Sequence, residues 1–129
     1  MSYLMDTHVL LWFLAGDARL SGRAKRVIQG ESRIYFSPVS LWEIGIKLGL
    51  KKKQFQLAGD WWQSMPRALV QQGIERLDLR PENFRDVALL PLHHRDPFDR
   101  MLIVQAKEAS IKVISADAKL VKYDVEVVW

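Results

Sequence analysis

The sequence has no cysteine among its 129 residues, which excludes disulfide bonds and metal sites built from thiolates. It also has no apolar run that could cross a bilayer: the run at 9–15 is too short, and Asp6 and His8 before it differ from the basic start of a signal peptide. A glycine-rich phosphate loop, internal repeats and low-complexity tracts are missing too. We therefore expect a cytoplasmic protein that does not contact a membrane.

Length and composition are ordinary for a globular protein. Hydrophobic residues make up 49% of the chain and charged residues 26%, and 129 residues can bury a core without covalent cross-links. We predict one domain over residues 1–129.

The charge balance is basic. The net charge is +4, from 19 Lys and Arg against 15 Asp and Glu, and it becomes +8 outside the site if four of the acids gather in one place. A basic exterior around an acidic pocket suits a polyanionic substrate held by its phosphates. The charge alone is equally compatible with a basic protein that has no such partner.

Short β-branched and aromatic runs alternate with longer segments of helical periodicity. Strands are predicted at 3–5, 34–36, 74–79, 111–114 and 125–129. Helices are predicted at 8–15, 24–28, 39–48, 57–72 with an interruption near Pro66, 81–90 and 97–109, with a helical turn at 118–122. Lys51, Lys52 and Lys53 are predicted to form a solvated turn. The alternation predicts an α/β fold whose central, mostly parallel sheet is flanked by helices on both faces.

The stretch from His94 to Leu102 contains a helix start with two carboxylates. Asp96 stands at the N-cap position, Pro97 suits the first helical position, and Asp99 falls at the third. Both carboxylates lie at the positive end of the helix dipole, which favours their ionised forms. A single motif of this kind is usually a capping pair, so evidence for chemistry must come from other segments.

Three further acids follow predicted strands. Asp6 comes directly after the first strand, Glu43 follows the second by about one helical turn, and Asp117 follows the fourth. The carboxyl ends of parallel strands meet at one edge of a sheet, so these side chains can converge there. Asp99 joins them if its helix begins at the same edge.

Each acid also has a purely structural explanation. Asp6 and Asp117 could be plain N-caps, while Glu43 could form a capping box with Ser40 or an ion pair with Lys47. Four acids repeated at one topological position are better explained as one site.

Carboxylates gathered in one pocket repel each other. A pair about 4 Å apart costs roughly 4 kcal/mol at an effective dielectric constant near 20. Protons or divalent cations must offset this repulsion, and oxygen ligands without cysteine select hard ions, so we expect Mg²⁺ or Mn²⁺. Such an ion activates water and neutralises charge on a phosphoryl oxygen, as phosphodiester hydrolysis requires.

Four ordered motifs resemble the PIN-domain ribonucleases, specifically the VapC-like toxins of bacterial toxin–antitoxin pairs. The motifs are MDTHVLLW at 5–12, SLWEIGIK at 40–47, HRDPFDRML at 94–102 and SAD at 115–117. The resemblance covers essentially the whole chain. It implies a single PIN domain that cleaves single-stranded or looped RNA internally with Mg²⁺ or Mn²⁺ and with water as the nucleophile. It also implies a small cognate antitoxin that covers the acidic cleft, and a homodimer.

The resemblance further assigns roles to residues. The catalytic, metal-binding acids would be Asp6, Glu43, Asp99 and Asp117, with Asp96 as an auxiliary metal ligand. The substrate-binding or auxiliary residues would be Thr7, Lys47, His94, Arg100 and Ser115. Ser115 would orient Asp117 or a bound water, and Lys47 and Arg100 would balance the acids or contact a phosphate, although both could form plain ion pairs.

Histidine chemistry is not expected. His8 lies beside an apolar run, and the acids already supply ligands for a hard ion, so neither His8 nor His94 is predicted to form a zinc site or an imidazole catalyst. His94 could instead hydrogen-bond the acidic turn or the RNA.

Two other functions stay open. A phospho-acceptor signalling module is also a doubly wound domain with an acidic Mg²⁺ pocket, but it needs adjacent acids after the first strand and a lysine after a late strand. Here Asp6 stands alone and Asp117 takes the late position. In a non-catalytic RNA-binding module the acids would be caps, and loss of Asp99 would lower stability without changing RNA affinity.

Overall fold

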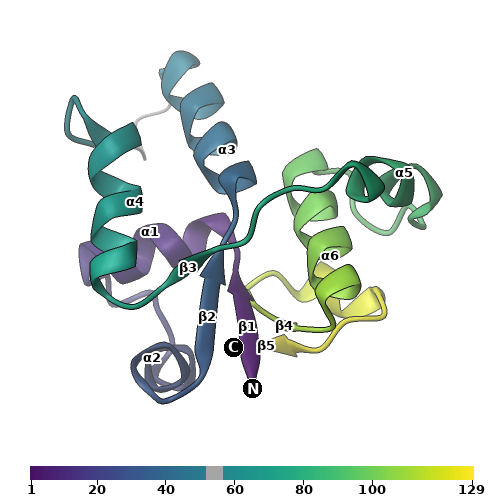
Figure 1. Cartoon of the computed structure of the whole chain (residues 1–129), viewed down its shortest axis with the longest axis horizontal. Helices are drawn as coiled ribbons and strands as arrows, with labels where there is room; N and C mark the ends of the chain where they lie inside the picture. Colours follow the sequence, from purple (N-terminus) through teal and green to yellow (C-terminus); the bar gives the residue numbers. More distant parts are fainter. Residues whose placement is uncertain (52–56) are drawn as a thin grey trace.

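The computed structural model describes residues 1–51 and 57–129, which form a five-stranded sheet covered by helices on both faces (Figure 1). Every strand pair is parallel, and the strand order is β3-β2-β1-β4-β5. This arrangement confirms the predicted α/β fold. Of the predicted lysine turn, Lys51 lies in an exposed turn, and Lys52 and Lys53 lie outside the described residues.

The elements follow the predicted order. The strands are β1 (Ser2–Met5), β2 (Arg33–Phe36), β3 (Glu75–Arg76), β4 (Lys112–Ile114) and β5 (Val127–Val128). The helices are α1 (Thr7–Ala15), α2 (Gly22–Gln29), α3 (Pro38–Gly49), α4 (Trp61–Gln71), α5 (Pro81–Leu89) and α6 (Pro97–Ala109), followed by the 3-10 helix η1 (Ala118–Lys122). Among the described residues, no helix is long and apolar enough to cross a membrane.

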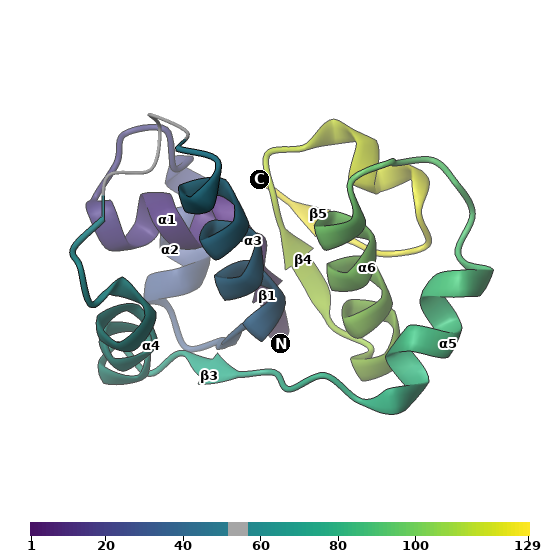
Figure 2. The same cartoon turned by 90° about the horizontal axis from the view of Figure 1, so that it is seen from above.

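The sheet separates two hydrophobic clusters, because successive side chains of a strand point to opposite faces. In β1, Tyr3 and Met5 belong to the cluster that α1, α2 and α4 cover, whereas Leu4 belongs to the cluster that α6 covers. Figure 2 shows α1, α2 and α4 gathered on the side away from α5 and α6. The central strands are therefore buried on both faces, as a parallel sheet requires.

Two strands are shorter than predicted. Only Glu75 and Arg76 of the predicted strand 74–79 pair with β2, followed by one hydrogen bond from the Leu77 N–H to the Phe36 carbonyl. The reason is that β2 ends at Phe36, so the edge strand has no partner farther along. In the same way β5 is confined to 127–128, because β4 ends at Ile114.

The predicted helix at 57–72 is wrong in two respects. It begins only at Trp61, and it runs through Pro66 without interruption. A proline in a helix interior removes one backbone hydrogen bond and costs about 3 kcal/mol. Met65 and Leu69 on this helix are buried in the core, and their burial offsets the loss.

The helix starts that position the functional edge follow local rules. Asp6 caps α1 by accepting a hydrogen bond from the Val9 N–H. Asp96 caps α6 through the N–H groups of Phe98 and Asp99, and Pro97 takes the first helical position as predicted.

The hydrophobic cluster under α6 should contribute strongly to stability. Leu102 is fully buried, so Leu102→Ala should lower the free energy of unfolding by about 2–5 kcal/mol. Leu89→Ala, at a side chain that is 78% exposed, should change it by less than about 0.5 kcal/mol. Urea titrations of both variants check this, and equal losses would contradict the assigned core.

Candidate active site

An acidic cavity lies at the carboxyl ends of the central strands. β1 and β4 are neighbours in the sheet although the chain visits β2 and β3 between them, so the strand order reverses at this point. In open α/β sheets ligands bind at such a reversal. The cavity has a volume of about 360 Å³ and is lined by Asp6, His8, Trp12, Glu43, Lys47, His94, Asp96, Asp99, Ala116 and Asp117.

Asp6 is held at the floor of this site between β1 and α1. Its backbone N–H donates to the Ile114 carbonyl at 3.1 Å, and its Oδ1 accepts from the Val9 N–H at 2.9 Å. Burial raises the pKa of Asp6, while the hydroxyl of Ser115 and the Val9 N–H oppose that rise by hydrogen-bonding the carboxylate. Ser115 also accepts a 3.0 Å hydrogen bond from the Asp117 N–H, so it links two of the acids.

Glu43 reaches the cavity from α3 and is only 3% exposed. Its Oε1 accepts a 2.6 Å hydrogen bond from the Thr7 hydroxyl, whose oxygen lies 3.0 Å from the Ser40 hydroxyl and can accept a hydrogen bond from it, and its Oε2 pairs with Lys47 one turn later. The predicted capping box between Ser40 and Glu43 does not form, because Ser37 is the N-cap of α3. Both oxygens of this buried carboxylate are therefore fixed in place.

Asp96 and Asp99 enter from the start of α6. Asp96 uses its Oδ1 to accept the N–H groups of Phe98 at 2.9 Å and Asp99 at 3.1 Å, so it acts as a cap while lining the cavity. Burial, and then the negative charges of Asp96, Asp6, Glu43 and Asp117, raise the pKa of Asp99 to about 8. Asp99 is thus the acid whose protonation responds to the surrounding negative charge.

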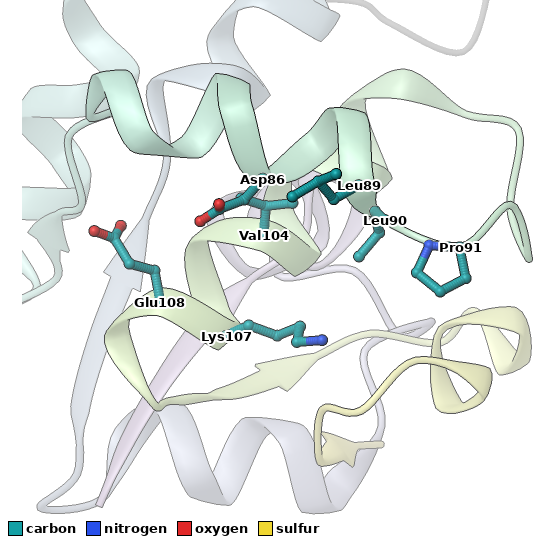
Figure 3. A pocket seen from close by; sticks show the side chains of 7 residues that line it. All are labelled: Asp86, Leu89, Leu90, Pro91, Val104, Lys107 and Glu108. Carbon is teal, nitrogen blue, oxygen red and sulfur yellow. The ribbon is translucent and has the colours of Figure 1, made fainter.

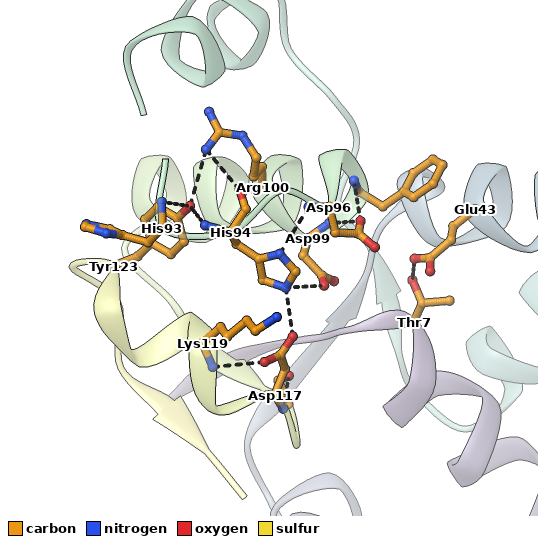
Figure 4. A network of polar contacts seen from close by, with 12 residues as sticks. Thr7, Glu43, His93, His94, Asp96, Asp99, Arg100, Asp117, Lys119 and Tyr123 are labelled. Carbon is orange, nitrogen blue, oxygen red and sulfur yellow. Dashed lines mark hydrogen bonds and ion pairs between the residues drawn. The ribbon is translucent and has the colours of Figure 1, made fainter. Parts of the chain in front are cut away.

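His94 joins Asp99 to Asp117 (Figure 4). Its Nε2 lies 3.2 Å from Oδ2 of Asp99 and 2.8 Å from Oδ2 of Asp117. Its Nδ1 accepts a 3.1 Å hydrogen bond from the Asp96 N–H, which assigns the proton of the neutral ring to Nε2. His94 therefore donates toward the two carboxylates, which was the structural role left open for it.

Asp117 is more exposed than Asp99, with side chains 35% and 19% exposed. It caps η1 by accepting the Lys119 N–H at 2.9 Å. Burial acts to raise the pKa of Asp117, but the hydrogen bonds from the Lys119 N–H and from His94 outweigh it and lower the pKa. At neutral pH Asp117 is therefore ionised, whereas Asp99 is largely protonated.

Arg100 does not line the cavity. Its guanidinium donates to the carbonyls of Val87, Leu90 and Pro91 at 2.9–3.2 Å, at the end of α5 and in the loop that follows. The Tyr123 hydroxyl receives the N–H groups of His93 and His94 at 3.1 and 2.9 Å in the same loop, and this support for His94 was missed by the sequence reasoning. Arg100 and Tyr123 thus hold the loop that carries His94.

A second cavity, of about 230 Å³, lies between α5 and α6 (Figure 3). It is lined by Asp86, Leu89, Leu90, Pro91, Val104, Lys107 and Glu108. Aliphatic side chains and one lysine accompany only two acids here. This cavity lacks the convergence of carboxylates seen at the strand ends.

The structure thus brings most of the predicted site residues together. Asp6, Glu43, Lys47, His94, Asp96, Asp99 and Asp117 line one cavity, and Thr7 and Ser115 bond to them from behind. His8 and Trp12 line it as well, and the sequence reasoning assigned neither of them to the site. The catalytic and metal-binding roles of these residues stay predictions.

The donor set fits a hard divalent cation. Carboxylate oxygens dominate the cavity, and ligand oxygens of Asp99 and Asp117 lie within 4.8 Å of each other. With the raised pKa of Asp99, these carboxylates are not all ionised at neutral pH in the absence of a cation. A bound cation would offset that repulsion.

Comparison with known proteins agrees with this fold. The PIN domain family matches residues 3–126. A sequence search of curated proteins found no match.

Several solved structures share the fold. VapBC2 from Rickettsia felis, solved with a DNA fragment from its promoter, matches with a TM-score of 0.69 and 12% identity over 99% of this chain and 98% of that one. DNA-bound VapBC from Salmonella typhimurium matches with a TM-score of 0.69 and 14% identity over 99% and 97%. VapBC-5 from Mycobacterium tuberculosis, a member of the VapBC family of toxin–antitoxin systems, matches with a TM-score of 0.58 and 17% identity over 98% and 97%.

The raised pKa of Asp99 should make stability depend on pH. With a pKa of about 8 in the folded chain against 3.8 ordinarily, the folded state retains a proton that the unfolded state has lost between about pH 4 and 8. This group therefore lowers the free energy of unfolding as pH rises through that range. In metal-free protein, Asp99→Asn should be more stable than wild type at pH 9 by at least about 1 kcal/mol, and the gap should close toward pH 4.

Urea titrations at pH 4, 7 and 9 in chelator measure this gap. Asp124→Asn changes an exposed aspartate outside the cavity and serves as the control. A gap for Asp99→Asn that does not change with pH would contradict the raised pKa.

The ion pair between Lys47 and Glu43 should matter more than pairs on the surface. Lys47→Met leaves a buried carboxylate without its cation, so the free energy of unfolding of metal-free protein at pH 7 should fall by about 2–4 kcal/mol. Adding Glu43→Gln should recover part of the loss. Lys112→Met breaks the more exposed pair with Glu126 and should cost less than about 1 kcal/mol. Equal losses of unfolding free energy in the two lysine variants would refute the larger contribution of the Lys47–Glu43 pair.

Proposed function

The chain belongs to the PIN-domain family of nucleases, and from this premise we propose that it is a metal-dependent endoribonuclease and the toxin of a toxin–antitoxin pair. One observation carries the proposal. Acids from four separate segments, Asp6, Glu43, Asp99 and Asp117, line a single cavity at the reversal of the strand order. Capping explains Asp6 and Asp117 singly, but it explains neither the inward position of Asp99 nor the burial of Glu43.

Asp6, Glu43, Asp99 and Asp117 would hold Mg²⁺ or Mn²⁺, with Asp96 beside them. When bound, the cation supplies the positive charge that makes a water acidic enough to attack a phosphodiester and that offsets charge on the phosphoryl oxygens. Without it, burial and then the neighbouring carboxylates keep the pKa of Asp99 at about 8. Binding a cation and releasing the proton from Asp99 are therefore coupled.

The other polar residues serve to orient the acids. His94 directs its Nε2–H at Asp99 and Asp117, Ser115 connects Asp117 to Asp6, and Thr7 with Lys47 fixes both oxygens of Glu43. Such partners hold ligands in one rotamer and prevent the site from relaxing when charge changes. The carboxylates of Asp117 and Asp99 both face Nε2 of His94, so a proton released by the attacking water has an acceptor close by.

RNA is the substrate that the charge pattern suits. Outside the four acids the chain carries 19 basic and 11 acidic residues, so a polyanion is attracted to the exterior while the cavity itself requires a cation. An open cavity at the edge of a sheet favours a single-stranded or looped segment, whose phosphates are accessible from several sides.

An antitoxin and a second copy of the chain are the proposed protein partners. Structures with this fold include VapBC complexes. Trp42 and Ile46 on α3 and Leu50 at its C-cap are 58%, 40% and 65% exposed at intervals of four residues, and Trp42 precedes Glu43 of the cavity in the sequence. Exposed apolar side chains at this spacing are a surface on which an antitoxin segment could pack.

RNA cleavage tests the proposed function. Purified protein free of antitoxin should cut a mixed pool of cellular RNA into discrete fragments with Mg²⁺ or Mn²⁺, and not in the presence of chelator. Asp6→Asn and Asp99→Asn should each lower kcat by about 100-fold or more, because each removes a carboxylate from the cation site.

The control variant is Asp124→Asn, which should cleave within twofold of wild type. A folded Asp99→Asn protein that cleaves at the wild-type rate would refute the site. Cleavage that persists in chelator would refute metal dependence.

A further inference from the structure

Three aromatic rings in contact extend from the edge of the acidic cavity. His8 and Trp12 are four residues apart on α1 and share one helix face, with ring centroids 5.6 Å apart at an angle of 41°. Trp12 in turn contacts Trp129, with centroids 5.6 Å apart at 50°. Because His8 and Trp12 line the cavity, these rings form an aromatic platform that begins where the acids end.

Trp12 is not placed there by the demands of the core. Its neighbours Leu11, Phe13 and Leu14 pack against the hydrophobic cluster on this side of the sheet, and so does Trp129. Trp12 is half-buried and turned toward the cavity instead. Its support from Trp129 keeps a large flat side chain in a fixed position beside the acids.

A cation stands next to this platform. The guanidinium of Arg19 lies 5.4 Å from the centre of the Trp12 ring. Asp17 holds it through a 2.7 Å ion pair, while the Arg19 side chain stays 69% exposed. A fixed positive charge beside an aromatic surface is the pattern that single-stranded nucleic acids bind, with bases on the rings and phosphates on the cation.

We propose that Trp12, flanked by His8 and Trp129, is a stacking site for an unpaired base of the RNA, and that Arg19 binds a neighbouring phosphate. This inference rests on the proposed ribonuclease function and adds the reason for a single-stranded substrate. A base within a duplex is stacked on both sides and cannot lie on the platform, whereas a base in a loop can. The platform would then position the next phosphates over the acids.

Steady-state kinetics on a single-stranded oligoribonucleotide provide the first test. Trp12→Ala should raise KM about tenfold or more, the range that loss of one base–aromatic contact gives, and should leave kcat within about threefold. Trp12→Phe keeps an aromatic face and should restore most of the affinity. Trp62→Ala, which removes a 57% exposed tryptophan from α4 away from the cavity, is the matched control and should not change KM.

Substrates with one abasic nucleotide separate stacking from a structural effect of Trp12. For wild type, one abasic position should raise KM to a similar extent as Trp12→Ala, and the same substrate should bring no further increase in that variant. If the abasic substrate raised the KM of Trp12→Ala by the same factor as it raises the KM of wild type, the inference would be overturned. An unchanged KM for Trp12→Ala with intact RNA would also overturn it, and would favour a protein partner for the platform.

Photo-crosslinking distinguishes failure of this inference from failure of the proposed function. Asp99→Asn protein is irradiated with an oligoribonucleotide that contains 5-iodouridine, and the modified peptide is identified by mass spectrometry. A crosslink at residues 8–19 or at Trp129 supports the platform even if wild type shows no cleavage. Cleavage by wild type together with crosslinks only elsewhere would reject the platform and leave the nuclease proposal standing.

Discussion

Mutual repulsion among carboxylates is the constraint on which the organisation of this protein depends. Each acid is held by a different device: Asp6 by backbone N–H groups and Ser115, Glu43 by Thr7 and Lys47, Asp117 by Lys119 and His94. At Asp99, burial and then the negative charges of the other acids raise the pKa to about 8. The parallel sheet makes this possible, because the rigid ends of β1, β2 and β4 bring three of the segments to one edge.

Local chemistry explains what could be predicted from the sequence. An N-cap such as Asp96 followed by Pro97 specifies a helix start within a few residues, and strands of β-branched residues specify the buried sheet, so the edge where the acids gather could be located. The short β3 and the intact α4 could not be found in this way. The first depends on where β2 ends, and the second on the burial of Met65 and Leu69, both of which are tertiary facts.

The different positions of His94 and Arg100 likewise depend on tertiary contacts and not on local signals. Both flank the acidic turn in the sequence, and neither spacing shows which one points inward. His94 bonds to Asp117, 23 positions away, whereas Arg100 turns back to the carbonyls at the end of α5. Tyr123, which receives the loop N–H groups, comes from beyond η1 and carries no local signal of this role. Contacts between distant segments decide such assignments, and sequence periodicity does not contain them.

In the proposed ribonuclease, a cavity crowded with acids has to admit a polyanion, and the surroundings of the acids make this physically reasonable. Lys47 neutralises Glu43, and the raised pKa of Asp99 reduces the negative charge that RNA meets before a cation binds. The aromatic platform on α1 then offers binding energy that does not depend on charge, since stacking on Trp12 is unaffected by the field of the acids. In this proposal the platform supplies affinity and the acids supply the chemistry within one cavity, which lets the acids be spaced for a cation alone.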